Sequence, residues 1–136
     1  MQPKFTELFA GTSTDKVYQL TFGGLDAAAV AVSILQSDGS WLAKKEGTDF
    51  TVNRTTGAIT FTTAPGTSLV TGEDNVKITA SRTVAGYADR INKCCFGTLF
   101  GVNGASDRIF AAGNPEHKNW DWYCDKDDPT YWPIVS

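Results

Sequence analysis

The sequence lacks any apolar run long enough to cross a membrane, and its opening residues do not combine a basic stretch with an apolar core. A membrane-spanning helix needs about 20 consecutive, mostly apolar residues. We therefore expect neither a membrane segment nor a signal peptide. With 136 residues, 41% of them hydrophobic and 20% charged, the chain has the size and composition of a small globular protein.

An excess of basic charge is also absent, because 12 Lys and Arg residues face 15 Asp and Glu residues, which leaves a net charge of −3. Residues 1–106 carry nine basic and nine acidic side chains, whereas residues 107–136 carry three basic and six acidic ones. Proteins that bind nucleic acid present a basic face to the phosphates. The composition therefore argues against a nucleic-acid partner, and the acidic surplus lies in the final segment.

Cysteine and histidine are scarce. The sequence has three cysteines, Cys94, Cys95 and Cys124, and one histidine, His117. An odd number of cysteines, two of them adjacent, favours free thiols in a reducing compartment. Zinc modules leave a gap between paired cysteines so that both thiolates reach one ion, and the adjacent pair here has no gap.

Four aspartates near the end of the chain do not make a calcium loop, because glycine at the sixth position and an acidic residue at the twelfth are missing. We therefore expect no metal site and no cofactor. These aspartates are Asp121, Asp125, Asp127 and Asp128.

The sequence also lacks the pattern of a catalytic site. The single histidine, His117, lies in a polar turn, and no serine is set in a Gly-x-Ser-x-Gly motif. Acidic residues are numerous enough for the paired carboxylates of a glycoside hydrolase, but no pattern places two of them in one cleft. We predict that the chain is not an enzyme.

The best-defined feature that is present is the segment of residues 49–65, DFTVNRTTGAITFTTAP, which predicts a β-hairpin. Apolar residues alternate with polar ones on both sides of a polar loop that ends in Gly57. Only an even-length loop keeps the apolar residues of both strands on one face. We therefore expect a four-residue loop with Gly57 at positive φ. The expected pairs are Val52 with Ile59 and Phe50 with Phe61.

Short runs of alternating apolar residues, separated by turn signals roughly every 8–12 residues, extend through residues 4–82. We predict a mainly β fold in which residues 1–84 form a small antiparallel, immunoglobulin-like β-sandwich. In residues 27–36 the alanines leave a helix conceivable, but the valines and the following Ser-Asp-Gly-Ser turn favour a strand. The expected core consists of Tyr18, Leu20, Phe22, Val30, Val32, Ile34, Trp41, Phe50, Val52, Ile59, Phe61, Val76 and Ile78.

Residues 85–136 differ in character and are predicted to form a short helix followed by two or three strands of a partial β-meander. In residues 87–100 the apolar residues recur at helical spacing, but Gly97 weakens a helix, so helix and strand both stay open. Two or three strands make a poor isolated sheet. We therefore expect this part to be the truncated start of a larger β domain, with tryptophans buried against the sandwich or a second copy. These are Trp120, Trp122 and Trp132.

Aromatic residues are concentrated in the same final part. Their faces suit the apolar faces of sugar rings, and flanking acidic groups can bind sugar hydroxyls. The same residue types equally suit a core or a protein interface. The candidate interaction surface consists of Trp120, Trp122, Tyr123, Tyr131 and Trp132.

Two motifs carry a resemblance to structural proteins of tailed bacteriophages. The segment EGTDFTVNRTTGAITFTTAP, followed by DNVKITA, is similar to a small β-sandwich module that recurs in phage tail and adaptor proteins. The later segment DRIFAAGNPEHKNWDWYCDKDDPTYWPIV resembles part of head–tail joining or tail stabilization proteins, although Cys124 stands where that family has a small residue or serine. Those proteins look like a sandwich followed by a β-propeller. The resemblance implies that residues 85–136 begin the first propeller blade.

The resemblance implies a non-enzymatic structural protein of a phage or prophage virion, placed in the head–tail connector or tail and acting through protein–protein assembly contacts. Its expected partners are other virion proteins, with a homo-oligomer as an open alternative and no role for nucleic acid or membrane. Its expected location is the virion and, during assembly, the cytoplasm of the host bacterium. The alternative hypothesis is a carbohydrate-binding adhesin or tail-fibre domain that holds a glycan on Trp120, Trp122 and Tyr123.

Overall fold

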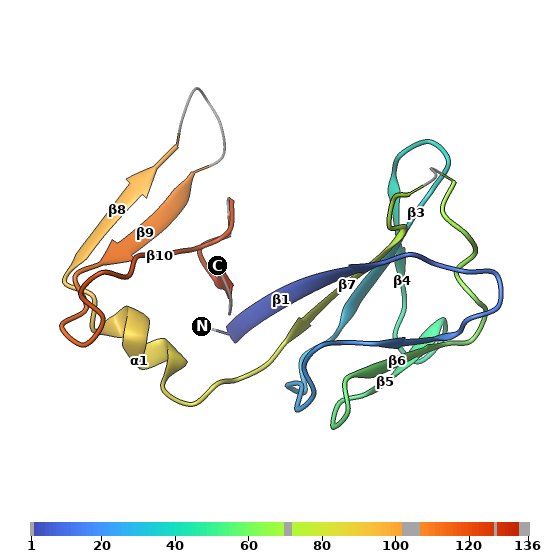
Figure 1. Ribbon diagram of the computed structural model, residues 1–136, viewed down its shortest axis with the longest axis horizontal. Helices are drawn as coiled ribbons and strands as arrows, with labels where there is room; N and C mark the ends of the chain where they lie inside the picture. Colours follow the sequence, from blue (N-terminus) through green and yellow to red (C-terminus); the bar gives the residue numbers. More distant parts are fainter. Residues whose placement is uncertain (1, 70–71, 102–106, 127, 134–136) are drawn as a thin grey trace. The chain divides into compact units, whose positions relative to one another are not determined.

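The computed structural model describes residues 2–69, 72–101, 107–126 and 128–133, and within these residues the protein is mainly β, as predicted (Figure 1). The chain divides into two compact units. Residues 6–82 form the first, which we call the sandwich unit, and residues 1–5 with residues 83–136 form the second, the C-terminal unit. None of the helices in the described ranges has the length and apolar character needed to span a bilayer.

The sandwich unit contains two β-sheets. One has the order β2-β6-β5, with β2 at Val17–Gln19, β6 at Ala58–Phe61 and β5 at Phe50–Asn53. In the other, β1 (Gln2–Phe9) is followed by β7 (Val76–Ser81), β3 (Ala31–Leu35) and β4 (Trp41–Lys44). The alternation of apolar residues along these strands produces the buried side of each sheet, as in β3, where Val32 and Ile34 are buried between more exposed neighbours.

Most of the predicted core residues are buried in this unit, and the exceptions have a structural reason. Trp41 is 38% exposed because it lies on β4, the last strand of its sheet, where its ring is covered by the ammonium group of Lys77 at 4.4 Å. Phe22 and Val52 are half-buried. The sequence pattern missed Leu25, which is buried.

The central hairpin has the predicted register. β5 and β6 pair antiparallel, with Val52 opposite Ile59 and Phe50 opposite Phe61. The loop closes at Gly57, which has a φ of 79° and whose N–H donates to the carbonyl of Asn53 at 2.8 Å. A left-handed conformation at this point favours glycine because other residues have a clashing Cβ.

The C-terminal unit resolves the choice between helix and strand that the sequence left open. The helix α1 covers only Tyr87–Asn92, and the strand β8 follows at Phe96–Phe100. β8, β9 (Arg108–Ala112) and β10 (Trp122–Tyr123) form a three-stranded antiparallel meander in the order β10-β9-β8.

A parallel pairing places the first residues of the chain in this unit. Gln2, Pro3 and Lys4 of β1 pair with β11 (Tyr131–Pro133), whereas the later residues of β1 belong to the sandwich unit. The predicted sandwich of residues 1–84 therefore differs from the observed unit at its beginning, because a pairing between distant segments cannot be read from local patterns.

The C-terminal unit has a hydrophobic core of its own. The helix contributes Tyr87 and Ile91, and the strands and turns contribute the other buried members, which are Ala111, Trp122, Cys124 and Trp132. Two of the tryptophans expected to need the sandwich or a second copy are therefore buried inside their own unit, at 9% and 5% exposure for Trp122 and Trp132. Trp120 is 53% exposed and stays outside this core.

Candidate interaction site

The five aromatic residues proposed as an interaction surface do not form one flat platform. Trp132 is a core residue whose indole N–H donates to the carbonyl of Pro129 at 2.9 Å. Tyr131 lies beneath the ammonium group of Lys4, which is 5.8 Å from the ring centre. The structure brings the other three, Trp120, Trp122 and Tyr123, to one pocket.

Exposed apolar side chains are grouped on the sheet of β8, β9 and β10. Residues that face each other across antiparallel strands share a face of the sheet. Phe96 is opposite Ala112, Thr98 is opposite Phe110, and Phe110 is opposite Tyr123, while Phe100 is opposite Arg108. We call this surface the aromatic face. It consists of Phe96, Thr98, Phe100, Arg108, Phe110, Ala112 and Tyr123.

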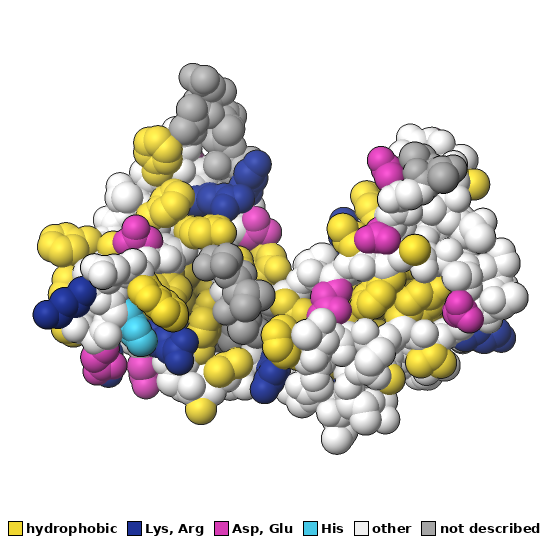
Figure 2. Space-filling view, in the orientation of Figure 1, with side chains coloured by type: hydrophobic (Ala, Val, Ile, Leu, Met, Phe, Trp, Pro, Cys, Tyr) yellow, Lys and Arg dark blue, Asp and Glu magenta, His cyan; other side chains and the backbone are white. Residues whose placement is uncertain are grey.

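The exposure of this face is unusual for a sheet that already covers a core. Phe96 and Phe100 are 73% and 58% exposed, and hydrophobic side chains are visible over β8 and β9 in Figure 2. The opposite face holds Ala111 and Trp122, which are buried in the core. An antiparallel sheet with one solvated face normally alternates apolar and polar residues. Apolar residues on both faces indicate a sheet that is suited to being covered on both sides.

The rings on the aromatic face are arranged in contact with one another. Phe110 lies between Phe100 and Tyr123, with ring centres separated by 6.4 Å and 5.9 Å. The Arg108 guanidinium lies 5.1 Å from the centre of the Tyr123 ring. A cavity of about 430 Å³ adjoins Phe96 and Phe110 and is also lined by Gly97, Thr98, Ala112 and Asp121.

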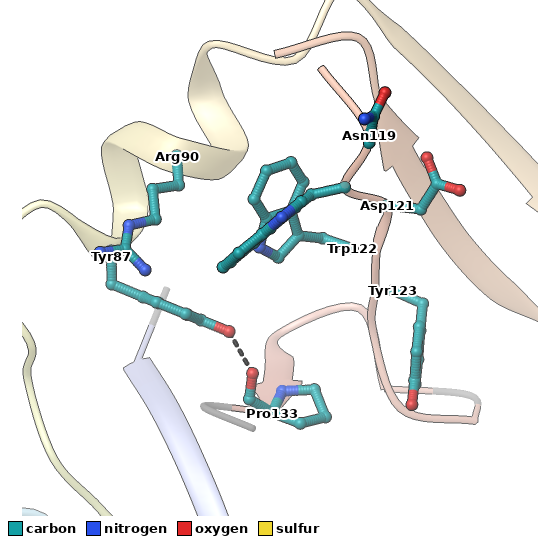
Figure 3. A pocket seen from close by; sticks show the side chains of 8 residues that line it. Tyr87, Arg90, Asn119, Asp121, Trp122, Tyr123 and Pro133 are labelled. Carbon is teal, nitrogen blue, oxygen red and sulfur yellow. Dashed lines mark hydrogen bonds between the residues drawn. The ribbon is translucent and has the colours of Figure 1, made fainter. Parts of the chain in front are cut away.

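The second feature is a pocket of about 330 Å³ between α1 and the segment that leads into β10 (Figure 3). Helix α1 contributes Tyr87 and Arg90, which lie on one side of the helix because they are three residues apart. The remaining lining residues are Asn119, Trp120, Asp121, Trp122, Tyr123 and Pro133. In Figure 3 the side chain of Arg90 lies beside Tyr87, whereas the carboxylate of Asp121 points away from Trp122.

Two contacts fix the walls of this pocket. The hydroxyl of Tyr87 donates to the carbonyl of Pro133, and burial raises the pKa of the Tyr87 phenol. The exposed Trp120 stacks against His117, with ring centres 4.9 Å apart, and lies 6.0 Å from the centre of the buried Trp122. Trp120 therefore offers an open aromatic surface at a pocket that is also lined by the buried and hydrogen-bonded Tyr87.

The cysteines of this unit lie in different environments. Cys124 is buried and its sulfur accepts the N–H of Ile109 at 3.0 Å, whereas Cys95 is exposed. Burial is the main cause that raises the pKa of Cys94. The described ranges contain no group of three or more His, Cys, Asp or Glu side chains that could hold a metal ion.

Two of the aspartates considered for calcium, Asp125 and Asp128, have local structural roles. Asp125 accepts the N–H of Lys126 at 2.8 Å. Asp128 accepts hydrogen bonds from the hydroxyl and the N–H of Thr130, and these bonds lower the pKa of its carboxyl group. Asp127 lies outside the described residues.

Comparison with protein-family models, with curated protein sequences and with solved structures found no match. The candidate sites are therefore defined by geometry alone. Sequence reasoning found three of the pocket residues from their aromatic character. It missed Tyr87, Arg90 and Pro133, although the three-residue spacing on a predicted helix was a signal for the first two. It left helix and strand open for the residues that form β8, because the helical spacing of the apolar residues extends over them.

Proposed function

We propose that this chain is a non-enzymatic structural component of a phage or prophage virion, in the head–tail connector or tail, and that it works through protein–protein assembly contacts. The observation that supports this proposal is the aromatic face, which leaves Phe96 and Phe100 exposed on a sheet whose other side already carries the buried Ala111 and Trp122. Large exposed apolar patches on soluble proteins mark interaction sites. The placement in a virion rests on the resemblance of the two sequence motifs.

The chemistry of the aromatic face suits a protein partner. Interface centres are enriched in aromatic residues and arginine and are depleted in other charged residues. The aromatic face has three phenylalanines and one tyrosine, and Arg108 at its border already lies against Tyr123. The partners that we propose are therefore other virion proteins, met in the virion and, during assembly, in the cytoplasm of the host bacterium.

A virion-incorporation experiment tests this function. In a strain that carries the gene in an inducible prophage, a double substitution of Phe96→Ser and Phe100→Ser should yield particles that lack the protein or remain unjoined. The matched control is Val17→Ser with Leu69→Ser, because these residues are 60% and 68% exposed in the sandwich unit. Wild-type particles of full infectivity that do not contain the protein would rule out a virion role.

The pocket supports a second candidate function, the binding of a carbohydrate. Its volume of about 330 Å³ is at the lower end of small-molecule sites, and the open ring of Trp120 is joined there by Arg90 and Asn119, whose N–H groups can donate to sugar hydroxyls. A glycan array should then show binding that Trp120→Ala abolishes. Trp41→Ala is the matched control, since Trp41 is 38% exposed in the sandwich unit. Trp122→Ala is unsuitable because Trp122 is buried. An array without binding would remove this candidate.

A further inference from the structure

The strand β8 is an exposed and uncharged sheet edge. It is the terminal strand in the order β10-β9-β8, and in the described part of the chain no strand pairs with its outer side. All five of its residues are exposed, including Phe96, Leu99 and Phe100. Natural proteins usually protect such edges with charged residues, proline or a bulge, because free N–H and C=O groups accept another strand. The sequence of β8, Phe-Gly-Thr-Leu-Phe, has no charged residue and no proline.

The side chains of β8 are complementary to the same strand in an antiparallel orientation. If Thr98 faces Thr98 of a second copy, each Phe96 faces Phe100 and each Gly97 faces Leu99 of the other copy. Aromatic pairs and Thr–Thr pairs stabilise antiparallel sheets when they are directly opposite. The small Gly97 leaves room beside the larger Leu99. Because the strand is uncharged, the pairing brings no like charges together.

We propose that β8 pairs antiparallel with β8 of a second copy, with the twofold axis at Thr98, so that two meanders join into one six-stranded sheet. This proposal rests on the proposed function, since it names one partner for the assembly surface. The axis is perpendicular to the sheet, so the aromatic faces of both copies lie on the same side. The dimer therefore presents a continuous aromatic surface of twice the width to further partners.

The area available to this contact sets its strength. The three large apolar residues of β8 are between 58% and 73% exposed. An aromatic side chain can bury roughly 150–250 Å², so the strand offers at most roughly 400 Å² per copy. A standard stable interface buries about 800 Å² per partner. The dimer is therefore weak and reversible, and its formation depends on protein concentration.

Charge substitutions at the axis test the pairing and its register together. Sedimentation equilibrium of the wild-type chain should show the mass rising from 14.7 kDa toward twice that value as concentration increases to about 1 mM. Thr98→Lys and Thr98→Glu should each weaken association at least tenfold, because each places two like charges opposite each other. An equimolar mixture of the two variants should associate again, since the opposing charges then attract. Circular dichroism checks that both variants are folded.

Other residues of the chain provide a control for the charge substitutions and a check of the register. Thr51 is an exposed threonine on β5, the terminal strand of a sheet in the sandwich unit, so Thr51→Lys and Thr51→Glu should leave the association unchanged. In addition, Thr98→Cys should form a disulfide between copies under mild oxidation. The native Cys95 should not form one, because in this register the two Cys95 residues lie about 20 Å apart along the strands.

The outcomes separate this inference from the proposed function. A wild-type chain that remains a monomer at about 1 mM, or variants that fail to re-associate when mixed, would overturn the second-copy pairing. If such a monomer binds the dye ANS, and Phe96→Ser with Phe100→Ser abolishes that binding, the aromatic face is open and the proposed assembly function still stands. A monomer that binds no ANS would contradict both the pairing with a second copy and the proposed assembly function.

Discussion

The loop of the central hairpin provides a quantitative test, because Gly57 is constrained in two independent ways. Its φ of 79° is in the left-handed region, and a Cβ added to it would lie less than 3.0 Å from the carbonyl oxygen of Phe22. Two backbone hydrogen bonds, both 3.1 Å long, join the loop to residues 20–24. The N–H of Leu20 donates to the carbonyl of Gly57, and the N–H of Gly24 donates to the carbonyl of Thr55. Gly57→Ala should therefore destabilise the sandwich unit through backbone strain and through a steric clash.

Two other glycines separate these effects. Gly39 has a φ of 82° and nothing within 4 Å of an added Cβ, so Gly39→Ala introduces only the backbone strain. Gly23 lies outside the left-handed region, but an added Cβ would be closer than 3.0 Å to the carbonyl oxygen of Thr55, so Gly23→Ala introduces only the clash.

The magnitudes follow from these geometries. The left-handed conformation costs an alanine roughly 1–2 kcal/mol, and the reduced entropy of the unfolded chain offsets roughly 0.4–1 kcal/mol of that cost. We therefore expect Gly39→Ala to lower the free energy of unfolding by about 1 kcal/mol or less. Overpacking typically costs about 1–3 kcal/mol. Gly23→Ala should fall in that range, and Gly57→Ala, which combines both effects, should cost about 2–4 kcal/mol.

Urea titration followed by the NMR amide signals of Ile59 and Phe61 measures these changes in the unit concerned, because both residues are buried in β6. The order of destabilisation should be Gly57→Ala, then Gly23→Ala, then Gly39→Ala. If Gly57→Ala costs no more than Gly39→Ala, the loop does not rest on the backbone around Phe22, and the packing argument fails.

Two further predictions concern the C-terminal unit. Tyr87→Phe should lower its stability by about 1 kcal/mol, because the carbonyl of Pro133 loses its donor. Since burial raises the pKa of Tyr87 above its ordinary value of 10.0, the wild-type unit should keep this stabilisation below pH 10 and lose it as the pH rises through the raised pKa. Thermal melts followed by tryptophan fluorescence should show a smaller alkaline loss in Tyr87→Phe, and identical pH profiles would contradict this assignment. For the thiols, Ellman's reagent should modify the exposed Cys95 first, Cys94 more slowly because burial raises its pKa, and the buried Cys124 only on unfolding. Rapid modification of all three cysteines in the folded protein would show that the core around Cys124 is open.

The local features of the sandwich unit could be predicted because their causes are local. The alternation along residues 49–65 determines which side of each strand is apolar. Only a loop with an even number of residues places the apolar sides of the two strands on the same face of the hairpin. The register of β5 with β6 and the position of Gly57 follow from this constraint, and the structure confirms both. Trp41 was wrongly placed in the core because its strand lies at a sheet edge, and strand order is not a local property.

The C-terminal unit shows where local patterns stop being informative. The spacing of apolar residues in residues 87–100 is compatible with one long helix and also with a short helix followed by a strand. Phe96–Phe100 forms a strand because it pairs with β9. Likewise, the aromatic content of the final residues indicated that they contribute to a core or to an interaction site. It did not indicate which aromatic residue has which of these two roles. Trp122 and Trp132 fill a core that includes residues of the distant helix α1, which leaves Trp120 exposed beside the pocket.

The sequence by itself determined the β-sandwich hairpin, its register, the mainly β class and the concentration of aromatic residues in the final segment, because each depends on neighbours within a few positions. Tertiary structure alone decided which aromatics are buried, that the first residues pair with β11, and that β8 is left as an uncharged edge beside an exposed aromatic face. The physical reason is that burial and edge position depend on contacts between segments that lie far apart in the chain. The residue pattern of a single segment does not show which distant segment it will contact.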